Sequence, residues 1–265
     1  MQELAYTTSV VSWSLLLSAI RLVRQSDPRV TPIDLNLAAP PCAILCCVAL
    51  EAFVNELSCL AEGFLFAQET SPPRRDSITP QGETTIGLSI DKCRKISQIK
   101  DCTRGSFYDR YKSLLKTAGI DKPYDMQSLS HLRDLRDSLV HFRTCLVPVV
   151  DDSNGIIRSD QQPPEVFVHL KSYKVHGWPV VAEDPDEVVG KWTLRISTNA
   201  MAAWSLTLVF DAIAHVIDKL PKGPYRDRVV RQYRSRDVAF TTVFEKGRAD
   251  VEEWKSGLFL AANRD

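Results

Sequence analysis

One long apolar stretch, residues 40–66, constrains the fold more than any other part of the chain. Its apolar side chains recur with helical spacing and cover a wide face: Ile44, Cys47, Val48, Leu50, Phe53, Val54, Leu57, Leu60, Ala61 and Phe64. A helix that is apolar on most sides is buried on most sides. Pro40 and Pro41 stand where a helix tolerates proline, in its first turn. We therefore expect a central helix that other helices surround.

Two polar residues, Glu51 and Asn55, interrupt this apolar helix. They are four positions apart and so lie on one side of it. A carboxylate in a core is costly unless a cation pairs with it. We expect Arg136, which borders the apolar face of a later helix, to pair with Glu51.

Further helices are predicted from apolar spacing and from their end signals. They cover residues 9–25, 90–99, 106–120, 127–146, 198–220, 224–236 and 248–262, with Ser106 as an N-cap and Gly119 as a stop. Alternating residues at 165–175 and 191–197 predict strands. We expect a mostly α fold: one helical domain over 1–265 with four to five bundled helices. A β-hairpin insertion at about 150–197 and a basic C-terminal tail at about 222–265 complete it.

The composition bounds the setting of the protein. Lysine plus arginine equals aspartate plus glutamate, 33 each, which argues against a general nucleic-acid coat but not against a local basic groove. The seven cysteines form no CxxC pair, so we expect no metal site, no cofactor and a reducing, cytoplasmic setting. The first residues, "MQELAYTTS", have no lysine or arginine, unlike a secretory signal. Charges interrupt the later apolar stretches, so no membrane span is predicted.

The helix over 127–146 contains Arg136, Asp137 and His141 within six residues. His141 lies five positions after Arg136, about 140° around the helix, an angle that a long arginine side chain can close. One interpretation is a salt-bridged helix, in which Asp134 or Asp137 pairs with a neighbouring arginine. The other is a site in which Glu51 orients Arg136 towards a phosphate.

The segment "RDSLVH", Arg136 to His141, matches the Arg-x4-6-His signature of HEPN domains (higher eukaryotes and prokaryotes nucleotide-binding). The segment "ALEAFVNEL" resembles the acidic second long helix of many such proteins. This resemblance implies a helical bundle and, in many members, metal-independent RNA cleavage at a site shared by a homodimer. It makes Arg136 and His141 the catalytic pair, with Glu51, Asn55 and Asp137 as supporting residues. Asp137 stands where the family most often has asparagine.

The residue types suit that chemistry. Histidine transfers protons near neutral pH, and arginine binds phosphate with a fixed fork of donors. We expect an endoribonuclease acting as a toxin or anti-phage effector, with RNA, a second copy and an antitoxin or other protein as partners. The alternative is a non-catalytic HEPN module that binds a nucleotide or a protein.

Other candidates are left open. A helix with five arginines is either a solvated face or an RNA-contacting strip: Arg226, Arg228, Arg231, Arg234 and Arg236. His131 is expected to be solvated or to cap its helix. His169 and His176, on a predicted strand and turn, lack a third metal ligand nearby.

Overall fold

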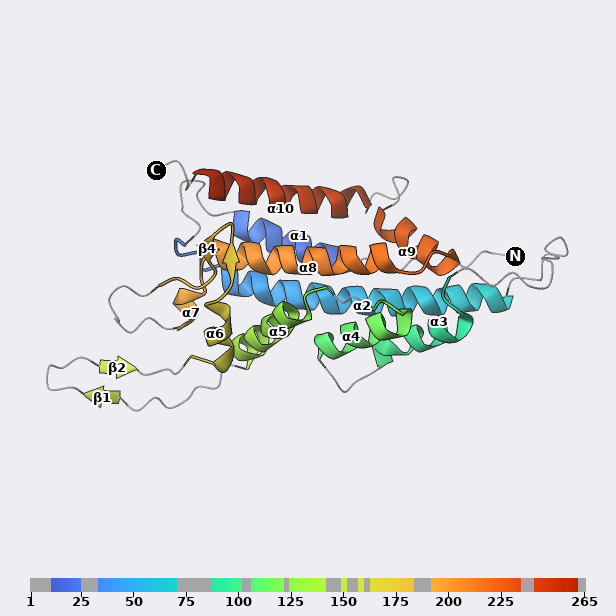
Figure 1. Cartoon of the computed structure of the whole chain (residues 1–265), viewed down its shortest axis with the longest axis horizontal. Coiled ribbons are helices and arrows are strands. Elements are labelled where there is room, and N and C mark those ends of the chain that lie inside the picture. The colour runs from blue at the N-terminus through green and yellow to red at the C-terminus, as the bar shows by residue number, and fades with distance from the viewer. Residues whose placement is uncertain are drawn as a thin grey trace. The chain divides into compact units, whose positions relative to one another are not determined.

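The protein is mostly helical, as predicted, with short antiparallel hairpins (Figure 1). The computed structural model describes residues 11–24, 33–70, 87–101, 106–121, 124–141, 149–151, 157–159, 163–183, 192–234 and 241–261. The helices are α1 (Val11–Arg24), α2 (Ala39–Thr70), α3 (Ile90–Ser97), α4 (Phe107–Ala118), α5 (Met126–Val140), α6 (Glu165–Leu170), α7 (Trp192–Arg195), α8 (Asn199–Lys219), α9 (Pro224–Arg234) and α10 (Thr241–Ala261). A 3-10 turn, η1 (Ile99–Asp101), follows α3, and the strands are β1 (Val149–Asp151), β2 (Ile157–Ser159), β3 (Lys174–Val175) and β4 (Trp178–Pro179).

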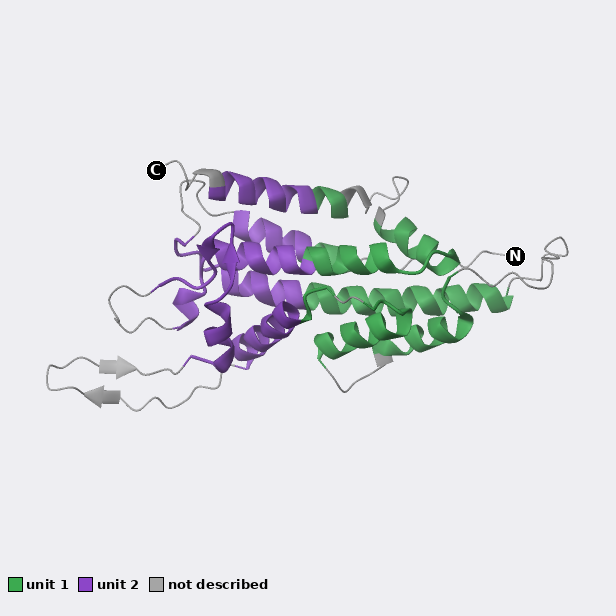
Figure 2. Ribbon diagram, viewed as in Figure 1, with its two compact units in different colours: residues 1–15, 48–126, 210–247 green, residues 16–47, 127–209, 248–265 purple. Residues whose placement is uncertain are grey.

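The chain divides into two compact units, coloured separately in Figure 2. Unit 1 comprises residues 1–15, 48–126 and 210–247, and unit 2 comprises residues 16–47, 127–209 and 248–265. The boundaries fall inside α1, α2, α5, α8 and α10, so each of these helices contributes residues to both units. One HEPN-like domain over 1–265 stays a prediction.

The core of unit 1 contains the greater part of α2, with Leu50, Phe53 and Leu57 fully buried. Two buried tyrosines form hydrogen bonds between helices of this unit. The Tyr225 hydroxyl on α9 donates to the Leu57 carbonyl at 2.9 Å, and the Tyr111 hydroxyl on α4 donates to the Ala212 carbonyl on α8 at 3.1 Å. The wide apolar face of α2 is therefore covered on several sides, as its sequence predicted.

A buried carboxylate, Glu56, joins three helices of unit 1. The Ser12 backbone N–H and hydroxyl donate to its two oxygens at 2.8 and 2.7 Å, and the Tyr233 hydroxyl donates to it as well. These contacts satisfy an amide at the start of α1, where helix N–H groups have no partner of their own. Burial raises the pKa of Glu56, although the hydrogen bonds from Tyr233 and Ser12 lower it. The carboxylate belongs to the scaffold.

The ends of α4 fall where the sequence signals predicted. The Ser106 side chain accepts from the Asp109 N–H, and the Asp109 side chain accepts from the Ser106 N–H, which is a capping box. Gly119 ends the helix with φ 75°, a left-handed conformation that costs glycine little.

Unit 2 contains all of α5 except its first residue, and Leu129, Leu132 and Leu135 of this helix are fully buried. The Cys47 thiol donates to the Leu132 carbonyl at 3.6 Å and so fastens the first part of α2 to α5. The predicted extent of this helix, 127–146, is wrong at its end. The helix ends at Val140 and His141 lies in a turn, while residues 142–148 are outside the described part.

The predicted strands at 165–175 and 191–197 are wrong in most of their length, because these segments form α6 and α7. In α6 the buried residues are Val166, Phe167 and Leu170, a helical spacing, whereas Val168 is 64% exposed. A strand would have placed Val168 on the same face as Val166. The pattern in α7 is similar, with Trp192 and Ile196 buried four positions apart.

Two small antiparallel hairpins lie in the predicted insertion. In the first, Val149 pairs with Ser159 and Asp151 with Ile157. In the second, β3 and β4 are joined by His176 and Gly177, which have φ of 50° and 87°. Positive φ at both central residues is typical of the tight turn whose twist matches a hairpin. The prediction of a β-hairpin is confirmed, although its strands are not those expected.

Candidate functional site

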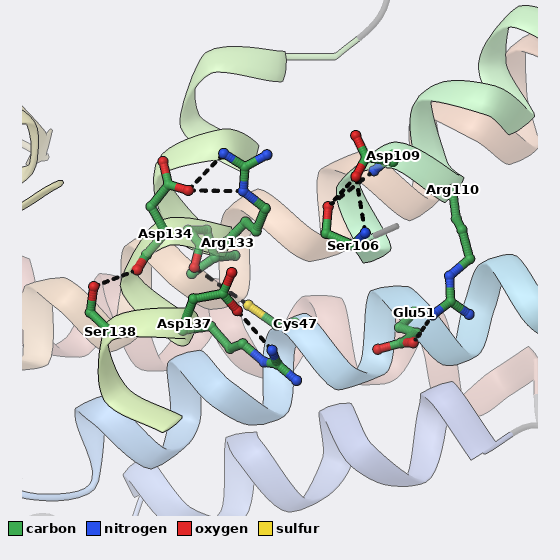
Figure 3. A network of polar contacts seen from close by, with 11 residues as sticks. Cys47, Glu51, Ser106, Asp109, Arg110, Arg133, Asp134, Asp137 and Ser138 are labelled. Atoms are coloured by element: carbon green, nitrogen blue, oxygen red, sulfur yellow. Dashed lines mark hydrogen bonds and ion pairs between the residues drawn. The ribbon is translucent and has the colours of Figure 1, made fainter. Parts of the chain in front are cut away.

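Arg136 lies on α5 beside the buried leucine face and is only partly covered. Its Nη1 donates to Oδ1 of the next residue, Asp137, at 2.7 Å (Figure 3). The two side chains are 31% and 45% exposed. An ion pair this accessible to water contributes about 0–1 kcal/mol. Arg136 is therefore held locally and weakly.

The predicted pair between Glu51 and Arg136 is wrong. Glu51 is paired with Arg110 of α4, whose Nη2 donates to its Oε1 at 2.6 Å (Figure 3). The Arg110 Nη1 also donates to Asn55 Oδ1 at 3.3 Å, so both polar residues of the apolar α2 bind the same guanidinium. Sequence spacing showed that Glu51 needs a cation, but the packing of α4 against α2 in unit 1 decides which one.

The Glu51–Arg110 pair is more enclosed than the Arg136–Asp137 pair. The Arg110 side chain is 17% exposed and Glu51 30%. Arg110 Nε is buried with no hydrogen-bond partner among the described residues. This network explains the two polar positions on α2 through packing alone. Glu51 and Asn55 consequently do not support Arg136 as the sequence had suggested.

His141 lies directly after the last residue of α5, and its side chain is exposed. Its backbone N–H donates to the Asp137 carbonyl at 2.9 Å, so the helical hydrogen-bond pattern extends to His141. The imidazole is therefore accessible to solvent in the single chain. Arg136 and His141 are thus both accessible at the C-terminal end of one helix.

A cleft of about 460 Å³ runs along α5 within unit 2. Three carboxylates line it, Asp134 and Asp137 from α5 and Glu165 from α6. No lysine or arginine is among its lining residues, all of which the structure describes. Its polar character comes from these carboxylates, two histidines and two serines of α5. The cleft therefore presents acceptors and negative charge.

The two histidines of the cleft are stacked on one another. The rings of His131 and His169 have centroids 4.6 Å apart and planes 3° apart. His131 Nδ1 lies 2.8 Å from the Tyr173 hydroxyl. The expectation that His131 is solvated or caps its helix is wrong, because it is half-buried between α5 and α6. His169 was expected on a strand, and its place in the cleft could be predicted only with α6 known to be a helix.

The arginine helix, α9, belongs to unit 1. Val229 and Tyr233 are buried and form its inner face, as predicted. Arg226 and Arg228 are half-buried, and the Arg228 guanidinium lies against Gly63 of α2. Arg231 is exposed. The strip is thus partly a packing surface.

The remaining two arginines of the predicted strip are Arg234 and Arg236. The side chain of Arg234 and the whole of Arg236 are outside the described part of the chain. Between the solvated face and the RNA-contacting strip, the choice stays open.

Metal binding has no support in the described part of the chain, which contains no group of three or more histidine, cysteine or acidic side chains suited to an ion. Cys42, Cys46 and Cys47 are buried on α2. Burial, with the neighbouring Cys42 and Cys47, raises the pKa of the Cys46 thiol well above its ordinary value. These residues act as small hydrophobic side chains, as expected from their position.

Two helices, α2 and α8, are long and apolar enough to cross a membrane by length and composition. The charges in α2 do not prevent this, contrary to the sequence prediction. However, 61% of the apolar window of α2 and 83% of that of α8 are buried inside the protein. Core helices of soluble proteins have the same property, so this finding is weak support for a membrane span.

Comparison of the chain with protein-family models, curated proteins and solved structures gave no match. The geometry at the end of α5 is therefore the basis for a functional proposal.

Proposed function

We propose that this protein is a HEPN-like, metal-independent endoribonuclease whose catalytic pair is Arg136 and His141. One observation supports the proposal: Arg136 and His141 are both accessible to solvent at the C-terminal end of α5, although the Arg133–Asp134 and Arg136–Asp137 pairs also match the salt-bridged helix that the sequence allowed. Arg136 is left with a neighbouring, exposed carboxylate, and His141 follows it at the solvent-exposed end of the helix. An arginine and a histidine placed there can both reach a ligand from solvent.

The proposed reaction is the attack of a ribose 2′-oxygen on the adjacent phosphorus. A histidine accepts the 2′-hydroxyl proton, the new 2′-O–P bond forms, and the P–O5′ bond breaks. A second, protonated imidazole gives its proton to the leaving O5′ atom. The products are a 2′,3′-cyclic phosphate and a 5′-hydroxyl, with no oxidation or reduction. Arg136 would stabilise the negative charge that develops on the phosphoryl oxygens.

One chain supplies one His141, and the reaction uses both a base and an acid. A two-fold dimer would bring two Arg136–His141 pairs together through an isologous contact. We therefore include a homodimer in the proposal. The exposed side chains of Val140 and His141 at the end of α5 are compatible with such a contact.

A second candidate function is a non-catalytic HEPN-like module that binds a nucleotide or a protein. The Arg136–Asp137 ion pair favours it, because a carboxylate 2.7 Å from the guanidinium competes with phosphate. For both candidates we propose a cytoplasmic location. For the ribonuclease we further propose a role as a toxin or anti-phage effector, with an antitoxin-like protein partner that inhibits its activity.

Cleavage and binding of single-stranded RNA in EDTA distinguish the two candidates. We expect the wild type to cut RNA and Arg136→Ala to lose at least tenfold in rate, as expected for the loss of a phosphate-stabilising donor. Arg94→Ala is the matched control, because Arg94 is also an exposed arginine paired with a nearby aspartate, Asp91. Binding of RNA without cleavage would support the module, and equal rates for both variants would contradict the assignment of Arg136.

A further inference from the structure

The cleft beside α5 is lined by acidic side chains, whereas a phosphate site is usually lined by basic ones. Asp134, Asp137 and Glu165 line it, and no lysine or arginine does so among the described lining residues. Asp134 and Asp137 are each paired with a neighbouring arginine, so Glu165 is the carboxylate that would repel a phosphate there. Its volume of about 460 Å³ is nevertheless in the range of small-molecule sites, which is roughly 300–1,000 Å³. The cleft is therefore suited to a ligand that offers hydrogen-bond donors.

The cleft and His141 lie on the same face of α5. Asp134, Asp137 and His141 are three and four positions apart, and the helical hydrogen bond from the His141 N–H to the Asp137 carbonyl continues the pattern. At 100° per residue the three point within about 60° of one another. His141 is about 6 Å along the axis from Asp137 at 1.5 Å per residue. A ligand that has a phosphate beside Arg136 and His141 can therefore place a neighbouring group in the cleft.

The acceptors of the cleft retain capacity for a ligand. Both hydrogen bonds from Arg133 to Asp134 end on one oxygen, Oδ1, at 2.8 and 2.6 Å (Figure 3). The Arg136 bond likewise ends on Oδ1 of Asp137. Glu165, in the first turn of α6, has no ion pair or hydrogen bond from its side chain to any described residue. A carboxylate accepts two parallel N–H bonds when both oxygens are available.

The second wall of the cleft is aromatic. His169 is exposed, lies one helical turn after Glu165 on α6, and stacks on His131. The Tyr173 hydroxyl, 2.8 Å from His131 Nδ1, holds that ring in place. Single-stranded RNA is read in this manner, by stacking of bases on aromatic or histidine rings and by hydrogen bonds to their Watson–Crick edges.

We propose that this cleft is the base-specificity pocket of the ribonuclease site, and that it takes the guanine next to the cleaved phosphate. This inference rests on the proposed function. Guanine presents two adjacent donors, N1–H and the N2 amino group, and so matches a bidentate carboxylate. Adenine, cytosine and uracil each present a donor next to an acceptor, which a carboxylate repels. Glu165 reads the guanine edge and His169 supports its plane.

Two readouts test the pocket, using the full-length protein. The first is binding of the uncharged nucleoside guanosine, compared with adenosine and cytidine, by titration calorimetry or ligand-observed NMR. We expect guanosine to bind best and Glu165→Gln to weaken it roughly tenfold or more, as for the loss of a bidentate base contact. Glu253→Gln, an exposed glutamate on α10, is the matched control and should bind like the wild type.

The second readout is the sequence at the cut site, obtained from cleavage of a random RNA pool in EDTA. Wild type should cut next to guanosine, and Glu165→Gln should lose that preference with slower cleavage. Guanosine binding without RNA cleavage would retain the pocket and refute the nuclease. Cleavage without base preference, unchanged in Glu165→Gln, would overturn the pocket, as would binding of spermidine in preference to guanosine.

Discussion

Asp137→Asn should raise the rate of RNA cleavage, because the Asp137 carboxylate forms the ion pair with Arg136 that a phosphate would have to replace. A phosphate that binds Arg136 must displace a hydrogen bond of 2.7 Å and then lie near a negative charge. The ion pair is exposed, so breaking it costs about 0–1 kcal/mol. Repulsion between the carboxylate and a phosphate at about 5 Å adds about 1 kcal/mol, using a water-like dielectric because Asp137 is 45% exposed.

Together these terms give about 1–2 kcal/mol, which corresponds to roughly a 5- to 30-fold increase in kcat/KM. Asparagine keeps the size of the side chain, so the free energy of unfolding should change by less than about 1 kcal/mol. The assay is cleavage of a fluorescent single-stranded RNA in EDTA, with thermal unfolding as the check on folding. A folded Asp137→Asn protein with unchanged or lower activity would refute the reasoning.

Three further predictions follow from the packing and the proposed assembly. Arg110→Met should lower the free energy of unfolding by about 1–3 kcal/mol, because it leaves the half-buried Glu51 carboxylate unpaired. Arg136→Ala should lower it by less than about 1 kcal/mol. Chemical denaturation of both variants measures these changes, and a larger loss in Arg136→Ala would contradict the pairing seen here. Burial raises the pKa of Glu56 above its ordinary value of 4.5, so the folded protein holds this proton more tightly. That stability is present below pH 4.5 and lost as the pH rises through the folded pKa, so the stability of Glu56→Gln relative to wild type should increase across this window; a constant difference in unfolding free energy would exclude the effect. Light scattering at tens of micromolar should show a homodimer for wild type and for His141→Ala alike, and a strict monomer would remove the shared site.

Local signals predicted much of the fold. The capping box of Ser106 and the stop at Gly119 involve residues that are close together in the sequence, so both can be recognised from the sequence alone. The helix α4 accordingly begins and ends as expected. The wide apolar face of α2 indicated a central helix for the same reason. Short amphipathic segments were harder, because Val166 and Leu170 fit alternation and a helical turn equally well. Only the exposure of Val168 in the folded chain separates the two.

The candidate site was predicted less completely than the fold. Sequence alone indicated that Glu51 needs a cation, but several arginines satisfy that need and only tertiary packing selects Arg110. The cleft could not be predicted, since it depends on α6 packing beside α5. The spacing of Glu165 and His169, four positions apart, places both on one face of a strand or of a helix, so it could not indicate the cleft.

End-group analysis of RNA incubated with the purified protein in EDTA is the most direct test of the proposed cleavage. The account predicts fragments with 2′,3′-cyclic phosphate and 5′-hydroxyl ends, lost in His141→Ala but retained in His176→Ala, which removes another exposed histidine. Fragments with other ends, or the same fragments from a folded His141→Ala protein, would contradict it.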